Sequence, residues 1–340
     1  MRLYCCAEEM KPIIDIKPLL EQPRKIFITT HQKPDADALG SSLGLYHYLT
    51  LKGHTVTVVS PTEFPDFLVW MPGMNGVLNF EKQEEASLKA LNEAEILFCL
   101  DFNHADRTKK LAPHLLQAGQ PKVLIDHHMQ PAPDFDYGES DPQKSSTCEM
   151  VYDFINLMGD NALINLDMAQ CLYAGSMTDT GSFRFPSTSA NVHRMIADFK
   201  DRGLNHAYIH EQVYDNSEER RLRFLGFVLS QRMEVFPAKK AALIAISKED
   251  ARRFNLDMGD TEGLVNYPLG IKGIVFSTFI TEKADEVKMS FRSKGSFDVN
   301  TFARTYFDGG GHFNAAGGRS DIGFQQTVEK FKNILKTINI

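Results

Sequence analysis

The sequence predicts an α/β protein of two domains, the first built on a mostly parallel sheet with helices on both faces. Three observations lead to this fold class. At 340 residues the chain exceeds the roughly 250–300 residues that one hydrophobic core usually serves. Short apolar runs alternate with helical periodicity in the first half, as in parallel sheets. Strand-like patterns return near the C-terminus, which indicates a second, smaller α/β domain.

The first half alternates between expected strands and expected helices. Four short apolar runs read as buried strands, at 25–30, 55–60, 95–100 and 122–125. Helical periodicity covers 38–52, 84–94 and 106–117, and Gly53 suits the C-terminal end of the first of these helices. Helical patterns then dominate from 146 to about 234.

The pattern changes after Phe236 and Pro237. Strands are expected within 241–247, 272–280 and 286–293, and a helix at 324–335 follows them. We therefore expect a domain at 12–204, a connecting helical linker at 205–237 and a second domain at 238–340. The net charge is also unevenly distributed between the two parts of the chain. Residues from Lys239 onward carry 15 Lys and Arg against 12 Asp and Glu, a net charge of +3, and the preceding residues carry a net charge of −10.

Composition excludes several classes of protein. A net charge of −7 argues against coating a long tract of nucleic acid, because that affinity depends on neutralising many phosphates. No apolar run approaches the roughly 20 residues that cross a bilayer, and the first ten residues lack the features of a secretory signal. A cytoplasmic protein without a membrane partner is expected. The five cysteines lack CxxC spacing and read as reduced structural thiols.

Acids and histidines follow three of the expected strands. Because the functional crevice of a parallel sheet lies outside the carboxyl ends of its strands, these side chains are expected to converge. So many carboxylates in one cleft would repel each other unless bound cations compensated them. The candidate ligands are His31, Asp35, Asp37, Asp101, Asp126, His127 and His128, with Asp179 from a later helix-like stretch.

The ligand types favour two divalent cations. Carboxylates and imidazoles without thiolates suit Mn²⁺ or Mg²⁺, while Co²⁺ and Zn²⁺ stay open. The ligands are too many for one ion, and a bridging carboxylate can serve two ions about 3.5–4 Å apart. We assign His31, Asp35 and Asp101 to one cation. The other is assigned Asp37, Asp101, His127 and Asp179.

Each piece also has a plainer interpretation. A lone Asp-x-Asp is usually a solvated loop or a helix cap, and an Asp-His-His run alone can be a hydrogen-bonded core pair. Together, at three strand ends, they favour a metal centre. Gly40–Gly44 matches the G-x-S-x-G pattern, but its Ser42 would fall inside a helix, so we interpret Ser42 as a packing residue.

The stretch DGGGHFNAAGG at 308–318 is unusual in its glycines. Glycine runs are costly to order, so we expect a structured loop whose N–H groups form an anion-binding nest. His312 could donate to a phosphate oxygen, and Arg292 could supply a bidentate fork. The alternative is a flexible turn on the surface. Neither a dinucleotide-binding nor an NTPase glycine pattern occurs.

These motifs, in this order, resemble those of DHH-family phosphoesterases that carry the DHH-associated C-terminal domain. The resemblance covers about Ile14 to Ile340 and includes HQKPDADALGS, IDHH, SMTDTGSFRF and MSFRSKGSFDVNTFARTYFDGGGHFNAAGG. It is greatest to the stand-alone members that act as nanoRNases and pAp phosphatases. One departure is Ala36, which stands where many relatives carry glycine and would matter only in a backbone with positive φ.

The resemblance implies a hydrolase with a two-metal, usually Mn²⁺, centre in the first domain and its active site in the cleft between the domains. The implied metal ligands are His31, Asp35, Asp37, Asp101, His127 and Asp179. Asp126 and His128 would orient His127 and contact the substrate phosphate, acting with Asp101 in catalysis. The nucleotide end would be held by Arg292, Gly310, Gly311 and His312.

The expected activity is hydrolysis of short RNA oligonucleotides to 5′-mononucleotides by an in-line attack of hydroxide, and removal of the 3′-phosphate of pAp to give AMP. Linear dinucleotides (pApA, pGpG) or cyclic dinucleotides are alternative substrates within the family. An alternative of another class is a catalytically inactive nucleotide-binding sensor. A homodimer is compatible with the sequence.

Overall fold

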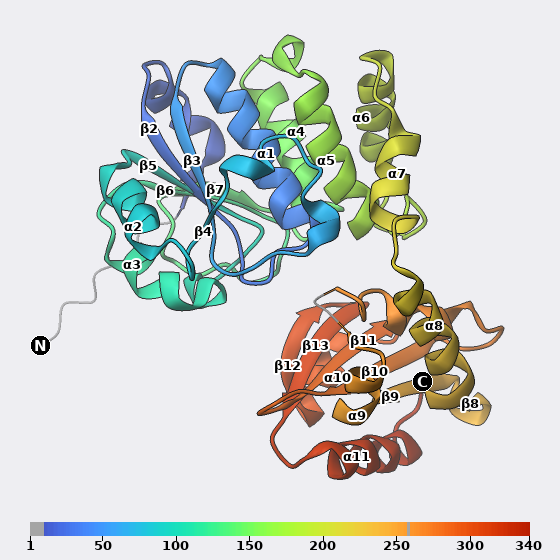
Figure 1. The fold of residues 1–340 in the computed structure, drawn as a ribbon. Coiled ribbons are helices and arrows are strands. Elements are labelled where there is room, and N and C mark those ends of the chain that lie inside the picture. The colour runs from blue at the N-terminus through green and yellow to red at the C-terminus, as the bar shows by residue number, and fades with distance from the viewer. Residues whose placement is uncertain (1–9, 257–258) are drawn as a thin grey trace, which may run out of the picture. The chain divides into compact units, whose positions relative to one another are not determined.

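The computed structural model describes residues 10–256 and 259–340 and forms two compact units, with the division between Asn216 and Ser217 (Figure 1). This division lies within 205–237, and a separate linker there stays a prediction. Cys5 and Cys6 fall outside the described residues. The other three cysteines, Cys99, Cys148 and Cys171, are buried and reduced.

The first unit contains a seven-stranded sheet in the order β1-β7-β6-β5-β2-β3-β4, and all neighbouring strands are parallel. The strand order reverses between β2 and β5, the kind of position where ligands bind in open α/β sheets. The predicted parallel sheet is confirmed. Its strands are β1 (Lys11–Pro12), β2 (Lys25–Thr29), β3 (Thr55–Ser60), β4 (Leu78–Asn79), β5 (Ile96–Leu100), β6 (Lys122–Asp126) and β7 (Tyr137–Ser140).

Helices cover both faces of this sheet (Figure 1). Successive strand residues point to opposite faces, so Ile26 and Ile28 enter one core while Phe27 enters the other. The first core is shared by α1 (Ala36–Leu51), α4 (Thr147–Leu157), α5 (Leu166–Asp179), α6 (Ala190–Asp201) and α7 (His206–Tyr214). The second is closed by α2 (Glu84–Glu93) and α3 (Ala112–Gln117).

The expected helix at 106–117 is only partly correct. Residues Ala105–Leu111 form 3₁₀ turns in which Lys109 has φ of 54°, and the α-helix α3 begins only at Ala112. Pro113 explains the restart, because proline lacks a backbone N–H and fits only the first turn of a helix.

The second unit has a mixed six-stranded sheet in the order β12-β13-β11-β10-β9-β8. A phenylalanine-rich core, with Phe276, Phe291, Phe302 and Phe331, joins the sheet to α10 and α11. The predicted second α/β domain is confirmed. Its elements are α8 (Glu219–Phe227), β8 (Met233–Phe236), β9 (Ala241–Ile246), α9 (Lys248–Arg253), β10 (Phe276–Glu282), β11 (Val287–Ser293), α10 (Val299–Tyr306), β12 (Asp308–His312), β13 (Ala315–Ser320) and α11 (Phe324–Thr337).

The glycine stretch forms a β-hairpin, so the expected loop is wrong, while anion binding by its glycines stays a prediction. β12 and β13 pair antiparallel, and a Cβ on Gly309 would collide with the Gly317 carbonyl oxygen. Close approach of two backbones therefore explains this glycine. The N–H of Gly311 donates to Asn300 Oδ1, at 3.0 Å.

Candidate metal centre

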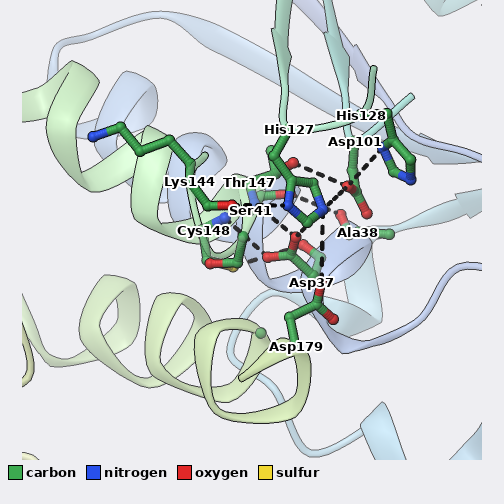
Figure 2. Close-up of polar contacts among 12 residues, drawn as sticks. Asp37, Ala38, Ser41, Asp101, His127, His128, Lys144, Thr147, Cys148 and Asp179 are labelled. Atoms are coloured by element: carbon green, nitrogen blue, oxygen red, sulfur yellow. Dashed lines mark hydrogen bonds and ion pairs between the residues drawn. The ribbon is translucent and has the colours of Figure 1, made fainter. Parts of the chain in front are cut away.

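The candidate ligands of the first unit meet at the carboxyl ends of β2, β5 and β6. Figure 2 shows Asp37, Asp101, His127, His128 and Asp179 among them. His31 follows β2, Asp101 follows β5 directly, and His127 follows β6 directly. Asp179, the last residue of α5, lies at the same place. The convergence expected from strand ends is therefore present in the fold, while the roles of these residues as metal ligands stay predictions.

Asp35 serves as the N-cap of α1 and also faces the site. Its Oδ1 accepts from the backbone N–H groups of Asp37 and Ala38, both at 3.0 Å. Its Oδ2 lies 3.9 Å from His31 Nε2. Ala36 lies in the first turn of α1 and is not among the residues with positive φ, so alanine adds no backbone strain there.

The nitrogen and oxygen atoms form two donor sets. In the first, His31 Nε2 lies 3.3 Å from Asp101 Oδ2, in addition to its contact with Asp35. The second is centred on His127 Nε2, which lies 3.8 Å from Asp37 Oδ2, 3.5 Å from Asp101 Oδ1 and 3.6 Å from Asp179 Oδ2. The two oxygens of Asp101 thus face different histidines, as a bridging carboxylate requires.

The spacing of these atoms fits cations better than direct hydrogen bonds. Hydrogen bonds in proteins usually span about 2.7–3.2 Å. Two ligands of one ion, each about 2.0–2.2 Å from it, lie roughly 3.0–3.6 Å from each other. One ligand atom per residue lies within 4.8 Å of all the others in the group His31, Asp35 and Asp101, and likewise in the group Asp37, His127 and Asp179. The residues present therefore fit two divalent cations.

Asp101 has an unusual backbone conformation. Its φ of 63° lies in the left-handed region, which asparagine and aspartate enter more readily than other non-glycine residues. Thr147 Oγ1 donates to Asp101 Oδ1 at 2.9 Å, and the Asp101 N–H donates to the Ile125 carbonyl at 3.0 Å. Strained backbone tends to persist at functional positions, and here it aims the carboxylate between the two sets.

The pKa values indicate a site that holds protons when it holds no cation. Burial, together with the negative charge of Asp101, raises the pKa of Asp37 to about 7. Burial and the charge of Asp37 raise the pKa of Asp179 well above its usual range. Burial alone would lower the pKa of His127, but Asp101 holds that pKa well above its ordinary value. Cations that bind must displace these protons.

Asp126 contacts His128, although the resemblance implied that it would orient His127. Its Oδ1 lies 2.7 Å from His128 Nδ1, whereas His127 Nδ1 lies 3.4 Å from the Lys144 carbonyl oxygen. Asp126 is the last residue of β6, so His127 and His128 lie beyond the strand, and both imidazoles lie near Asp101 Oδ1, at 3.5 and 3.7 Å. Asp126 Oδ2 is buried and, within residues 10–256 and 259–340, has no hydrogen-bond partner.

The start of α4 binds the Asp37 carboxylate, a contact that was not predicted from the sequence. The N–H groups of Thr147 and Cys148 donate to the Asp37 carboxylate at 2.7 and 2.9 Å (Figure 2). The N-terminus of a helix favours anions because its first N–H groups have no partner within the helix. The signal in the sequence was Ser146-x-x-Glu149, the pattern of a helix start.

Two candidate substrate residues of the second unit, Arg292 and His312, lie on one face of its sheet. Arg292 pairs with Ala315, and Ala315 pairs with His312 on the neighbouring strand. Directly opposed residues of antiparallel strands share a face, so Arg292 and His312 point to the same side. Gly310 and Gly311 lie against α10: a Cβ on Gly310 would meet the side chains of Asn300 and Arg304, and the Gly311 N–H donates to Asn300.

The two folds, with a buried carboxylate and imidazole centre in the first, define a DHH-type phosphoesterase. Residues 25–176 match the DHH family, N-terminal domain, and residues 240–339 match the DHHA1 domain. The chain is 32% identical to the bifunctional oligoribonuclease and PAP phosphatase NrnA of Thermus thermophilus, over 91% of this chain and 88% of that one. The chain belongs to the DHH family.

Solved structures agree on the fold. An exopolyphosphatase-related protein from Bacteroides fragilis is 39% identical, with a TM-score of 0.91 and 95% of each chain covered. RecJ from Thermus thermophilus, solved with Mn²⁺, has a TM-score of 0.57 at 13% identity, covering 98% of this chain and 56% of RecJ, and shares the fold alone.

An oligoribonuclease and a phosphatase both hydrolyse phosphoric esters, so the predicted enzyme class is confirmed. The helices of the described chain are too short or too polar for any of them to cross a bilayer.

Proposed function

We propose that this enzyme uses two divalent cations to hydrolyse short oligoribonucleotides to 5′-mononucleotides and to remove the 3′-phosphate of pAp, giving AMP. The observation that carries the proposal is the pair of Asp101 oxygens, each facing a different histidine-centred donor set. The activities in the name of the Thermus thermophilus relative support the two substrates.

Mn²⁺ is the proposed cation, with Mg²⁺ and Co²⁺ as alternatives. The donors are oxygens and imidazole nitrogens, which suit these ions. The nearby Cys148 is not expected to compete as a ligand, because burial and the charge of Asp37 raise the pKa of its thiol well above the usual range. When bound, two such cations make water a better nucleophile and neutralise charge on the phosphate oxygens.

The protein's own groups position the reaction. We assign His31, Asp35 and Asp101 to one cation, and Asp37, Asp101, His127 and Asp179 to the other. His128 is oriented through Nδ1 by Asp126, and we assign its Nε2 to a phosphate oxygen or to the leaving group. Arg292 and His312, with Gly310 and Gly311, hold the nucleotide end on the second unit.

A panel of substrates tests the proposal. The purified protein is offered, with Mn²⁺, pAp, RNA of two to five residues, pGpG, cyclic dinucleotides and a 24-residue RNA. We expect turnover of pAp and of the shortest RNAs, and little turnover of the 24-residue RNA. Preferential cleavage of pGpG or of cyclic dinucleotides would favour the alternative substrates of the family, and no turnover at all would favour an inactive sensor. A homodimer stays a prediction.

The pKa shifts predict that Mn²⁺ stabilises the protein more strongly at higher pH. The pKa of the Asp37 carboxyl is about 7 in the folded state, against an ordinary value of 3.8. The folded protein therefore loses stability as the pH rises from about 4 to 7, because this buried carboxyl must ionise. His127, whose folded pKa is raised, contributes stability below pH 6.5 that is lost as pH rises through that folded pKa. Both changes weaken the metal-free protein at high pH, and cations remove the cost.

The measurement is the shift in thermal midpoint on adding Mn²⁺ to EDTA-treated protein, between pH 5.5 and 8.5. The shift should grow as pH rises through about 7. A shift that is constant, or that is largest at acid pH, would contradict the proton-holding site.

A further inference from the structure

Glu149 is a buried carboxylate in the first turn of α4 that belongs to neither donor set. It is 1% exposed. Its Oε2 accepts from the N–H and the hydroxyl of Ser145, both at 2.8 Å. Its Oε1 accepts from Asn191 Nδ2 at 3.1 Å and from Ser189 Oγ at 3.4 Å. A carboxylate is costly to bury, and these hydrogen bonds from two separate segments offset that cost.

The segment that Glu149 holds, residues 144–148, contacts three of the six proposed ligands (Figure 2). The Lys144 carbonyl oxygen faces His127 Nδ1, which leaves Nε2 turned to the other donors. The N–H groups of Thr147 and Cys148 hold Asp37, and the Thr147 hydroxyl holds Asp101. A shift of this segment would move Asp37, Asp101 and His127 together.

The Glu149 side chain is not required to begin the helix. Ser146 is the N-cap of α4, and its Oγ accepts from the Glu149 N–H at 3.0 Å. That capping bond uses the backbone of Glu149 and leaves its carboxylate to other partners. The carboxylate reaches back to Ser145, before the helix, and across to Ser189 and Asn191 at the start of α6.

We propose that Glu149 is a positioning residue of the metal centre: it clamps residues 144–148 so that Asp37, Asp101 and His127 stay in binding geometry. The inference rests on the proposed function, because it concerns the cation site of that reaction. Loss of partners that orient metal ligands typically costs about 10–100-fold in metal affinity or activity.

Glu149→Gln is the principal test. Glutamine keeps the size of the side chain, but its NH₂ group must face either the Ser145 donors or the Asn191 donor, and one hydrogen bond is lost. We expect Mn²⁺ binding, measured by titration calorimetry or by the EPR signal of free Mn²⁺, to weaken about 10–100-fold. The kcat for short RNA should fall while KM changes little, and the metal-free protein should keep its thermal midpoint within a few degrees.

Asp153→Asn is the matched control. Asp153 lies one turn further along α4 and also contacts Lys144 and Asn191, with Lys144 Nζ at 2.6 Å and Asn191 Nδ2 at 3.1 Å. These contacts are to side chains, whereas the Glu149 carboxylate also holds the backbone of Ser145. The Asp153→Asn variant should therefore bind Mn²⁺ as the wild type does.

The outcomes separate this inference from the proposed function. Wild-type Mn²⁺ affinity in Glu149→Gln, or an equal loss in Asp153→Asn, would overturn the positioning role. If the wild type binds Mn²⁺ and Glu149→Gln does not, yet neither hydrolyses a phosphoester, the positioning role stands and the proposed function fails. A wild type that binds no Mn²⁺ overturns both. If Glu149→Gln does not fold, Ser145→Ala removes one bond to Oε2, and unchanged Mn²⁺ affinity in that variant would overturn the inference.

Discussion

Replacing Asp101 with asparagine is expected to reduce Mn²⁺-dependent hydrolysis of short RNA at least about 10³-fold, because the metals' contribution of several kcal/mol is lost. Asparagine is the informative replacement, since it tolerates the φ of 63° and can keep the bond from Thr147. It lacks the second anionic oxygen that would bridge the cations. Asp101→Ala should be equally inactive and less stable, because alanine is strained in this conformation.

The measurement for Asp101→Asn is kcat with saturating Mn²⁺, together with the thermal midpoint of the protein. Asp106→Asn is the control, because Asp106 is an exposed carboxylate in the 3₁₀ turns that follow Asp101. The control should retain wild-type activity. An Asp101→Asn enzyme that stays active and is stimulated by Mn²⁺ would remove the bridging assignment.

The second large effect is expected from the second unit. Arg292→Ala or His312→Ala should lower kcat/KM for short RNA by roughly 10–100-fold, since a hydrogen bond to a charged group contributes about 1.5–3 kcal/mol. The same variants should change hydrolysis of bis(p-nitrophenyl) phosphate much less. That substrate tests the metal centre and offers no terminal phosphate to hold.

Lys288→Ala is the control for these variants. Lys288 lies four residues before Arg292 on the same face of β11, and it pairs with Glu286 at 3.5 Å. Its loss should leave both substrates unaffected. Equal losses on both substrates in Arg292→Ala and His312→Ala would refute their assignment to the nucleotide end.

The strand ends could be predicted because their signal is local. Runs such as 25–30 and 122–125 are short and apolar, and the rule for parallel sheets places whatever follows them at one edge. That was enough to bring His31, Asp101 and His127 together from the sequence alone. The first helix, expected at 38–52 with Gly53 after it, was predicted to within two residues at each end, since α1 spans Ala36–Leu51.

The contacts that the sequence did not reveal depend on distant parts of the chain. The glycines at 309–311 looked like a loop because nothing local shows that Gly309 packs against the Gly317 backbone. In the sequence Glu149 is one of several acidic residues in a helical pattern. Its burial depends on the distant Asn191 in α6, which donates to its carboxylate. The contact of Asp126 with His128 depends on how the chain turns after β6, which the motif does not show.

Anomalous diffraction at the manganese edge, from crystals grown with Mn²⁺, would locate the cations of this enzyme. We expect two manganese ions about 3.5–4 Å apart, with one oxygen of Asp101 on each. His31 and Asp35 should complete one set, and Asp37, His127 and Asp179 the other. A single ion, two ions elsewhere, or donors turned away from each other in the presence of Mn²⁺ would contradict this expectation.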